Sequence, residues 1–145
     1  MSRVCLIIDS KLGDVPLAAV AVNGICVHLG LGKIQAREVE LCIAEAATNT
    51  ILHAYHGLAG ETVSIAVSTE IDRLHIEVCD TGSSIPAEQV ERLIRGADIV
   101  EIDRASLLEG GRGLQIIHDL MDEVAYTREG NRNRLQLMKR IPIRR

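Results

Sequence analysis

Two pairs of strand-like segments constrain the fold of this chain more than any other feature of its sequence. Residues 62–70 (TVSIAVSTE) and 73–80 (RLHIEVCD) are rich in β-branched side chains, and only two residues separate them. Residues 123–129 (EVAYTRE) and 134–141 (RLQLMKRI) lie on the two sides of a turn that contains glycine and asparagine. Segments joined by so short a connection pair as antiparallel hairpins. The sequence therefore predicts a sheet that is built mainly from two hairpins.

The other segments predict one further strand and four helices. Residues 15–31 are apolar on nearly every side, which predicts a buried helix, and residues 35–56 carry the apolar stripe of a second helix. The remaining predictions are a short strand at residues 3–8 and helices at residues 87–96 and 114–122. This order predicts one domain, residues 1–145, of the α+β class: a two-layer sandwich with helices on one face of a mixed, mainly antiparallel sheet.

Composition argues against several classes of function. The chain has 145 residues, of which 47% are hydrophobic, and this fits one folded domain. The net charge of −4 and the absence of phenylalanine and tryptophan argue against nucleic-acid binding, which needs a basic surface or aromatic platforms. No segment resembles a secretory leader or a membrane span, so the expected location is the cytoplasm. The four cysteines lack metal-ligand spacing and are expected to be small buried residues.

The predicted helix at residues 35–56 carries a row of three polar side chains beside its apolar stripe. Glu45, Asn49 and His53 follow one another at intervals of four residues. Residues with this spacing lie one turn apart on nearly the same side of a helix. Either the row is a solvated helix face, or it gathers a carboxylate, an amide and an imidazole at one site.

A second candidate lies where the predicted strand at residues 73–80 ends. Asp80 closes this strand, and Gly82 follows in the sequence DTGSSIP. An aspartate at a strand end can accept a hydrogen bond from an amine of a ligand, and a nearby glycine lets the backbone approach that ligand closely. The same pattern is also frequent in ordinary Asx turns, which need no ligand.

The third candidate is a glycine-rich segment before the last predicted helix. Gly111, Arg112 and Gly113 lie in EGGRG and precede Leu114, where the helix is expected to begin. Glycines before a helix leave backbone N–H groups free to bind phosphate, and the helix dipole assists. The segment lacks the Gly-Lys-Ser/Thr ending of a P-loop. The alternative is a flexible loop that binds nothing.

Taken together and in this order, the three segments resemble the nucleotide-binding boxes of the GHKL ATPase superfamily, which includes gyrase, MutL and the histidine kinases. EAATNTILHAY resembles its N box, DTGSSIP its first glycine box and GGRGLQII its second. The resemblance covers nearly the whole chain. It implies the two-layer Bergerat fold, with ATP and Mg²⁺ as ligands.

Glu45 indicates which group within this superfamily the chain resembles most. Histidine kinases usually carry asparagine at this position, because a histidine nitrogen is a ready nucleophile, whereas a serine hydroxyl benefits from a carboxylate that takes its proton. The patterns E-x-x-x-N-x-x-x-H-A-Y and G-R-G-L are similar to those of the anti-sigma factor serine/threonine-protein kinases of the RsbW and SpoIIAB type. That family implies an anti-sigma factor that phosphorylates a serine of a STAS-domain anti-anti-sigma factor in a partner-switching cycle. It also implies binding of a sigma factor and homodimer formation, without direct nucleic-acid or membrane contact.

The resemblance further implies roles for single residues. Glu45 would be the general base that takes the proton of the incoming serine hydroxyl, and Asn49 would bind Mg²⁺ through its amide oxygen. Asp80 would bind the adenine amine, and Gly82 would let the base pack closely. His53 is expected to be structural rather than catalytic.

The second glycine box would bind the phosphates. Gly111 and Gly113 would face them through backbone N–H groups, with Leu114 completing the ATP-binding set. Arg112 would contact either phosphate or the docked partner. Residues 83–110 would form a lid that closes on the nucleotide.

Two departures from the family pattern leave a second function open. The first glycine box usually reads D-x-G-x-G, but here Ser84 replaces the second glycine. The final hairpin often brings a threonine near the nucleotide, whereas this chain has GNRNR. The alternative is therefore an anti-sigma module that binds partners and has lost kinase activity. A detached histidine-kinase ATPase domain is a third interpretation, which Glu45 disfavours.

Overall fold

Five strands form one antiparallel sheet. The computed structural model describes residues 2–96 and 111–142. Its strands are β1 (Arg3–Asp9), β2 (Thr62–Glu70), β3 (Arg73–Asp80), β4 (Glu123–Glu129) and β5 (Arg132–Arg140). They lie in the order β1-β2-β3-β5-β4, and each neighbouring pair is antiparallel. Both predicted hairpins are confirmed, and the pairing of the described strands is antiparallel throughout.

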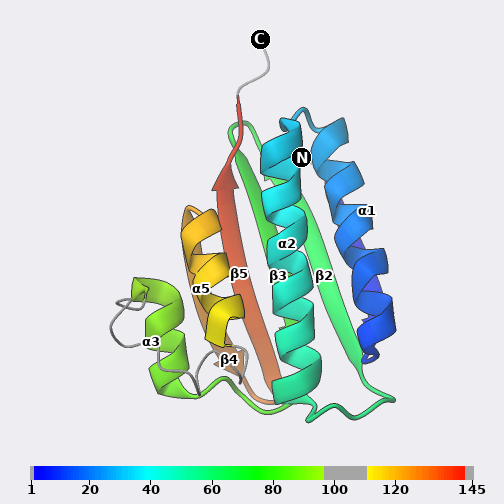
Figure 1. The fold of residues 1–145 in the computed structure, drawn as a ribbon, viewed down its shortest axis with the longest axis vertical. Helices are drawn as coiled ribbons and strands as arrows, with labels where there is room; N and C mark the ends of the chain where they lie inside the picture. Colours follow the sequence, from blue (N-terminus) through cyan, green and yellow to red (C-terminus); the bar gives the residue numbers. More distant parts are fainter. Residues whose placement is uncertain (1, 97–110, 143–145) are drawn as a thin grey trace.

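The helices cover one face of this sheet. They are α1 (Val15–His28), which follows a 3₁₀ turn η1 (Leu12–Asp14), then α2 (Lys33–Asn49), α3 (Ala87–Arg95) and α5 (Gly111–Leu120). Figure 1 shows α1, α2 and α5 side by side over the sheet, with α3 beyond α5. Helix α2 packs between α1 and α5. The predicted two-layer α+β sandwich is confirmed.

Helix α1 is apolar on its outward face as well as its inward face. Val22 and Cys26 are fully buried against the sheet and α2, whereas Leu17, Val20 and Val27 are exposed. The prediction of a buried helix is therefore right for one face only. Within residues 2–96 and 111–142, neither α1 nor another helix has the length and hydropathy needed to cross a bilayer.

The second predicted helix changes its geometry before it ends. The sequence predicts one continuous helix, but α2 ends at Asn49 and Thr50–Ala54 form a π-turn, η2. The N–H of Tyr55 donates to the carbonyl oxygen of Thr50 at 3.1 Å, which is the i→i+5 hydrogen bond of a π-helix. Turns of this kind are often found at functional sites. Here the turn lies at the end of α2 that carries the predicted polar row.

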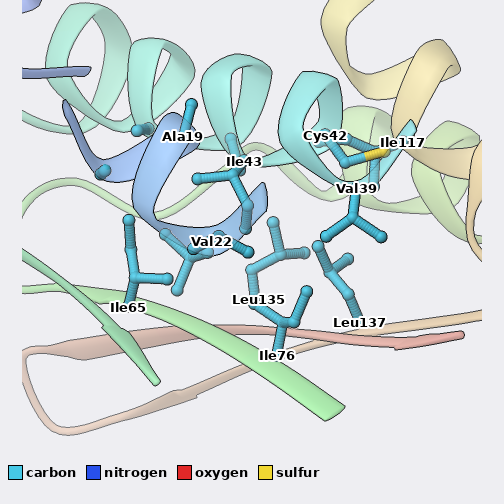
Figure 2. Packing of buried hydrophobic residues seen from close by; sticks show 14 of the residues in the cluster. Ala19, Val22, Val39, Cys42, Ile43, Ile65, Ile76, Ile117, Leu135 and Leu137 are labelled. Carbon is cyan, nitrogen blue, oxygen red and sulfur yellow. The ribbon is translucent and has the colours of Figure 1, made fainter. Parts of the chain in front are cut away.

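Aliphatic side chains fill the space between the two layers. The stripe expected on the second helix is buried, at Val39, Ile43, Ala46 and Thr50. Figure 2 shows Val39 and Ile43 of α2 above Ile76, Leu135 and Leu137 of the sheet. Each fully buried side chain of this size stabilises the fold by about 1.5–3 kcal/mol relative to an exposed one.

Strand β5 carries polar side chains at both ends of its inward face. Asn133 and Lys139 are both buried. Lys139 Nζ donates to the carbonyl oxygen of Leu120 at 2.7 Å and to Glu38 Oε2 at 3.1 Å. Lys139 therefore ties both α5 and α2 to the sheet at one end, while Asn133 lies at the other.

The cysteines follow the prediction with one exception. Cys26, Cys42 and Cys79 are buried, but Cys5 is exposed. The expectation fails at Cys5 because β1 is an edge strand, and Cys5 points away from the face that the helices cover. Burial raises the pKa of the Cys26 thiol to about 11 and that of the Cys42 thiol to about 12.

We expect a thiol reagent near neutral pH to modify Cys5 and to leave Cys26 and Cys42 unmodified until the chain unfolds. The reaction needs an accessible thiolate, and both buried thiols have a raised pKa. Iodoacetamide labelling followed by peptide mass spectrometry, with and without urea, measures this difference. A Cys5→Ser variant should lose the labelling that the native protein shows without urea. Modification of Cys42 in the native protein would contradict the packing of α2.

Candidate functional site

A cavity of about 320 Å³ opens where the C-terminal end of α2 meets the sheet. This volume lies in the range of pockets that hold small molecules. Its helix side is lined by Asn49, Thr50, His53 and Ala54, and its sheet side by Val78, Asp80, Tyr126 and Leu135. Residues 83–86 and Leu114 complete much of the wall. Three residues predicted to bind ATP, namely Asn49, Asp80 and Leu114, therefore face one cavity.

The structure divides the predicted polar row on α2. The described cavity wall includes Asn49 and His53 but not Glu45. The side chain of His53 is exposed, which gives no support to the structural role expected for it. Glu45 is partly buried one turn earlier on the helix and points to a different element.

Glu45 contacts the first turn of α5. A Cβ atom at Gly113 would lie 2.6 Å from Glu45 Oε2, which is closer than such atoms can approach. Only glycine at this position leaves room for the carboxylate as it lies here. A negative charge is also favoured near a helix N-terminus. The structure thus brings together two residues that the sequence predicts to act at the phosphate end of a nucleotide site.

Residues 111–113 form the first turn of a helix rather than a loop before one. Helix α5 begins at Gly111, whereas the sequence predicts a start at Leu114. The first N–H groups of a helix have no intrahelical acceptor, so those of Gly111, Arg112 and Gly113 remain suited to binding an anion. Leu114 is buried and lines the cavity. Of the predicted lid, residues 83–96 contain α3, and residues 97–110 lie outside the described residues.

Asp80 lines the cavity, and one of its two carboxylate oxygens is held by described residues. Its Oδ1 accepts hydrogen bonds from the N–H of Gly82 at 2.9 Å and from Asn133 Nδ2 at 2.8 Å. Its Oδ2 accepts none from the residues that the structure describes. The contact with Gly82 is the Asx turn that the sequence also allows. This turn does not use the second oxygen, which remains able to accept from a ligand.

Gly82 is required by the backbone beside it. A Cβ here would overlap the carbonyl oxygen of Ala54 and lie 2.6 Å from its carbonyl carbon. The next residue, Ser83, donates its N–H to that carbonyl oxygen at 2.9 Å. The glycine therefore lets the segment after β3 pack directly on the end of the π-turn. Gly82 itself is not among the described residues of the cavity wall, and its close approach is to the backbone of Ala54.

Two residues of the final hairpin were missed by the sequence analysis. Asn133 is 1% exposed and lies opposite Asp80 in the register of β3 and β5. Arg128 Nη1 donates to Asn133 Oδ1 at 2.8 Å. Residues two apart in a strand share a face, so the inward positions of Leu135 and Leu137 could have identified Asn133. The predicted strand began one residue too late to include it.

Tyr126 and Ser84 shape the side of the cavity below α3. Tyr126 Oη accepts the N–H of Ile85 at 2.9 Å. Burial raises the pKa of the Tyr126 phenol, so the hydroxyl stays protonated at neutral pH and can donate into the cavity. Ser84, which replaces the family's second box glycine, lines the cavity without adopting a positive φ. Its backbone therefore does not require glycine.

The donor set suits a metal ion that arrives with phosphate. Within residues 2–96 and 111–142, no group of three or more His, Cys, Asp or Glu residues could hold a metal. Mg²⁺ prefers oxygen ligands and is commonly bound by one or two protein groups together with substrate phosphates. Asn49 lies on the cavity wall, and a side-chain amide oxygen is a ligand of that kind.

Comparison with known sequences gives consistent matches along the chain. The family model described as "Histidine kinase-like ATPase domain" matches residues 8–139. The chain is 32% identical over 119 residues to the serine-protein kinase RsbW of Bacillus pumilus, covering 81% of this chain and 73% of that protein. It is 29% identical over 129 residues to RsbW of Listeria monocytogenes, covering 88% and 82%.

Solved structures of other proteins share the fold. The structure of the RsbU and RsbW domains of Rv1364c from Mycobacterium tuberculosis matches 99% of this chain with a TM-score of 0.67 and 12% identity. This chain spans 34% of that longer chain. The SiaB–SiaC complex from Pseudomonas aeruginosa gives a TM-score of 0.59 and 17% identity, covering 94% of this chain and 88% of that one. At such identities the likeness concerns the fold alone.

Proposed function

Because this chain belongs to the histidine kinase-like ATPase family, and within it to the RsbW serine-protein kinases, we propose that it is an anti-sigma factor and an ATP-dependent protein-serine kinase. The observation that carries the proposal is the contact of the Glu45 carboxylate with the first turn of α5. A helix N-terminus binds phosphate, and a carboxylate can take a proton from a hydroxyl. Phosphoryl transfer to serine needs both groups at one place.

The chemistry assigned to Glu45 is proton removal. The carboxylate takes the proton of the serine hydroxyl while the serine oxygen bonds to the γ-phosphorus of ATP. The bond from that phosphorus to the bridging oxygen breaks, and ADP leaves. The N–H groups of Gly111, Arg112 and Gly113 bind the phosphates at the start of α5. Leu114, buried behind this turn, contacts the nucleotide from the cavity wall.

Asn49 is the residue that we propose as the protein ligand of Mg²⁺. Asn49 lies on the cavity wall, one turn of α2 beyond Glu45, and its amide oxygen would be the ligand atom. When bound, the ion neutralises negative charge on the phosphates. Asn49 holds its place because the helix beneath it is anchored by buried Ile43 and Ala46.

The base of the nucleotide is assigned to the sheet end of the cavity. Asp80 Oδ2 accepts a hydrogen bond from the adenine amine, and the apolar side chains of Val78 and Leu135 line the same cavity. Gly82 acts indirectly in this proposal. Its packing on Ala54 holds the segment that follows Asp80, and its N–H fixes the other oxygen of the carboxylate.

The proposed partners are a STAS-domain anti-anti-sigma factor, a sigma factor and a second copy of the chain. The relatives named serine-protein kinase RsbW support the first of these. The structural neighbour SiaB is in complex with SiaC, which supports a fold that binds protein partners. The exposed apolar side chains of α1, Leu17, Val20 and Val27, offer surface of the kind that protein interfaces cover. We assign the cycle to the cytoplasm, where ATP is available.

A partner-binding module without kinase activity is the second candidate. It is motivated by Ser84 and by GNRNR, where the family usually has glycine and threonine. Ser84 needs no unusual backbone conformation, and Asn133 of GNRNR hydrogen-bonds Asp80. Neither departure removes a group to which we assign chemistry. The two candidates differ in whether phosphate is transferred.

We expect the protein to transfer labelled γ-phosphate from Mg-ATP to one serine of a STAS-domain protein that binds it. Asp80→Ala should raise the KM for ATP about tenfold or more, because a hydrogen bond to a charged group is lost. Asp72→Ala removes a carboxylate from the exposed turn between β2 and β3 and should leave the KM unchanged. Phosphopeptide mass spectrometry and initial rates measure both effects. Tight partner binding with no transfer would favour the second candidate.

A further inference from the structure

A row of three polar side chains crosses the sheet at the cavity end. Asp80 of β3, Asn133 of β5 and Arg128 of β4 are direct cross-strand neighbours. Asn133 Nδ2 donates to Asp80 Oδ1 at 2.8 Å, and Arg128 Nη1 donates to Asn133 Oδ1 at 2.8 Å. The amide of Asn133 therefore bridges an anionic and a cationic side chain.

The two ends of this amide cannot exchange. Turning it over would set its oxygen against the Asp80 carboxylate and its NH₂ group against the Arg128 guanidinium. Nδ2 also donates to the carbonyl oxygens of Gly82 at 3.0 Å and Ser83 at 3.3 Å. With 1% of Asn133 exposed, water does not compete for these bonds. The amide therefore holds one fixed orientation.

A fixed amide gives Asp80 a fixed orientation in turn. Oδ1 is engaged by both Asn133 and the Gly82 N–H, so rotation of the carboxylate would break two hydrogen bonds. Asp80 lines the cavity, and its Oδ2 accepts no hydrogen bond from the part of the chain that the structure describes. A ligand amine can pair with it, whereas a ligand carbonyl would meet it oxygen to oxygen. Because the two carboxylate oxygens are equivalent acceptors, the hydrogen bonds of Asn133 and Gly82 fix the direction of the carboxylate and hence the place of the acceptor that a ligand meets.

We propose that Asn133 is a positioning residue that sets the preference of this site for a base with an exocyclic amine over a base with a carbonyl at the same place. The inference rests on the proposed function, since it assigns the base of the nucleotide to Asp80. It goes beyond that function in naming the residue that makes the selection. Arg128 supports Asn133 from the far side of the row.

The test compares ATP with inosine triphosphate, which differs in carrying a carbonyl in place of the adenine amine. Affinities of Mg²⁺ complexes of both are measured by calorimetry for the wild type, Asn133→Ala and Asn133→Thr. Gln136→Ala is the matched control, because it deletes an amide from the same strand on the opposite face, where Gln136 donates to Glu77. A folding check by circular dichroism accompanies each variant.

We expect the wild type to prefer ATP by about 10–100-fold, the range for a hydrogen bond to a charged group. Asn133→Ala should reduce this preference about tenfold, because the Gly82 N–H is then the remaining described donor to Asp80 and the carboxylate can turn away from the ligand. Asn133→Thr should keep it within about threefold, since its hydroxyl can still donate to Oδ1. Gln136→Ala should leave it unchanged. A purely structural role would lower both affinities together and leave their ratio intact.

Three results would overturn the inference. An unchanged ratio in a folded Asn133→Ala variant would show that Asp80 selects the base without Asn133. A wild type that binds both nucleotides equally would remove base selection from Asp80. A wild type that binds neither would end the proposed function itself, and the inference with it. If Asn133→Ala does not fold, the Arg128→Ala variant tests the inference instead. Arg128 is exposed, so its loss should leave the fold intact and still lower the ratio of ATP affinity to inosine triphosphate affinity several-fold.

Discussion

Replacing Glu45 with glutamine is expected to slow phosphoryl transfer about 10²–10⁴-fold, the usual contribution of a general base. Glutamine has nearly the same size and can keep the contact with Gly113, but it cannot take the proton of the serine hydroxyl. The affinity for Mg-ATP should stay close to that of the wild type, because the side chain of Glu45 is not part of the described cavity wall. Single-turnover phosphorylation of the STAS partner and calorimetry measure the two quantities separately.

Glu40→Gln is the matched control for this variant. Glu40 lies on the same helix, and the structure pairs it with the exposed Arg37 at 3.9 Å, so its neutralisation should not alter the rate. Normal transfer by Glu45→Gln would remove Glu45 from the role of base. Equal loss of ATP affinity and of rate would instead assign Glu45 to nucleotide binding.

Gly113→Ala tests the same assignment from the other side of the contact. The added Cβ would lie 2.6 Å from Glu45 Oε2, which is too close, and a flexible side chain can move away at little cost in stability. Alanine also favours a helix more than glycine does. The variant should therefore fold normally yet transfer phosphate slowly, because the carboxylate is displaced. A fast and stable Gly113→Ala protein would contradict the need for this contact.

The elements of the fold were predictable because their signals are local. A two-residue connection between β-branched segments predicts a hairpin, and the apolar stripe from Val39 to Thr50 predicts a helix packed on the core. The π-turn at Thr50–Ala54 has no such signal. It depends on what the backbone of Ala54 contacts, and that is Gly82 and Ser83 at the end of a distant strand.

Residues of the candidate site were predictable where their own type and position in the sequence indicate a role. They were not predictable where the role depends on the pairing of several strands. Asp80 could be identified because it closes a strand and begins a turn. Its partnership with Asn133 depends on the register of β3 with β5, which the sequence does not state. Arg128 is one step further, because it reaches Asp80 through Asn133 and through the turn at Gly82, whose carbonyl oxygen accepts from Arg128 Nη1 at 3.0 Å. The sequence GNRNR, which we interpreted as the loss of the family's threonine, contains Asn133, and Asn133 donates a hydrogen bond to Asp80.

Gly82→Ala is expected to lower the free energy of unfolding by about 3 kcal/mol. Overpacking against atoms that cannot yield costs about 1–3 kcal/mol, and a lost hydrogen bond about 1 kcal/mol more. The methyl group would overlap the carbonyl oxygen of Ala54, which is backbone and is already bonded to the N–H of Ser83. Separating the two segments would also disturb the N–H that Gly82 donates to Asp80. Urea denaturation followed by circular dichroism measures the change.

Gly24→Ala adds the same methyl group where it meets nothing. Gly24 lies inside α1 with no atom within 4 Å of the new Cβ, and alanine in a helix is more stable than glycine by about 0.5–1 kcal/mol. The two variants should therefore move stability in opposite directions. The affinity for ATP should fall in Gly82→Ala, because Gly82 donates a hydrogen bond to Asp80. It should stay unchanged in Gly24→Ala, because Gly24 lies in α1. A Gly82→Ala protein as stable as the wild type would mean that the segment after β3 can move off the π-turn. The orientation of Asp80 would then have to depend on Asn133 alone.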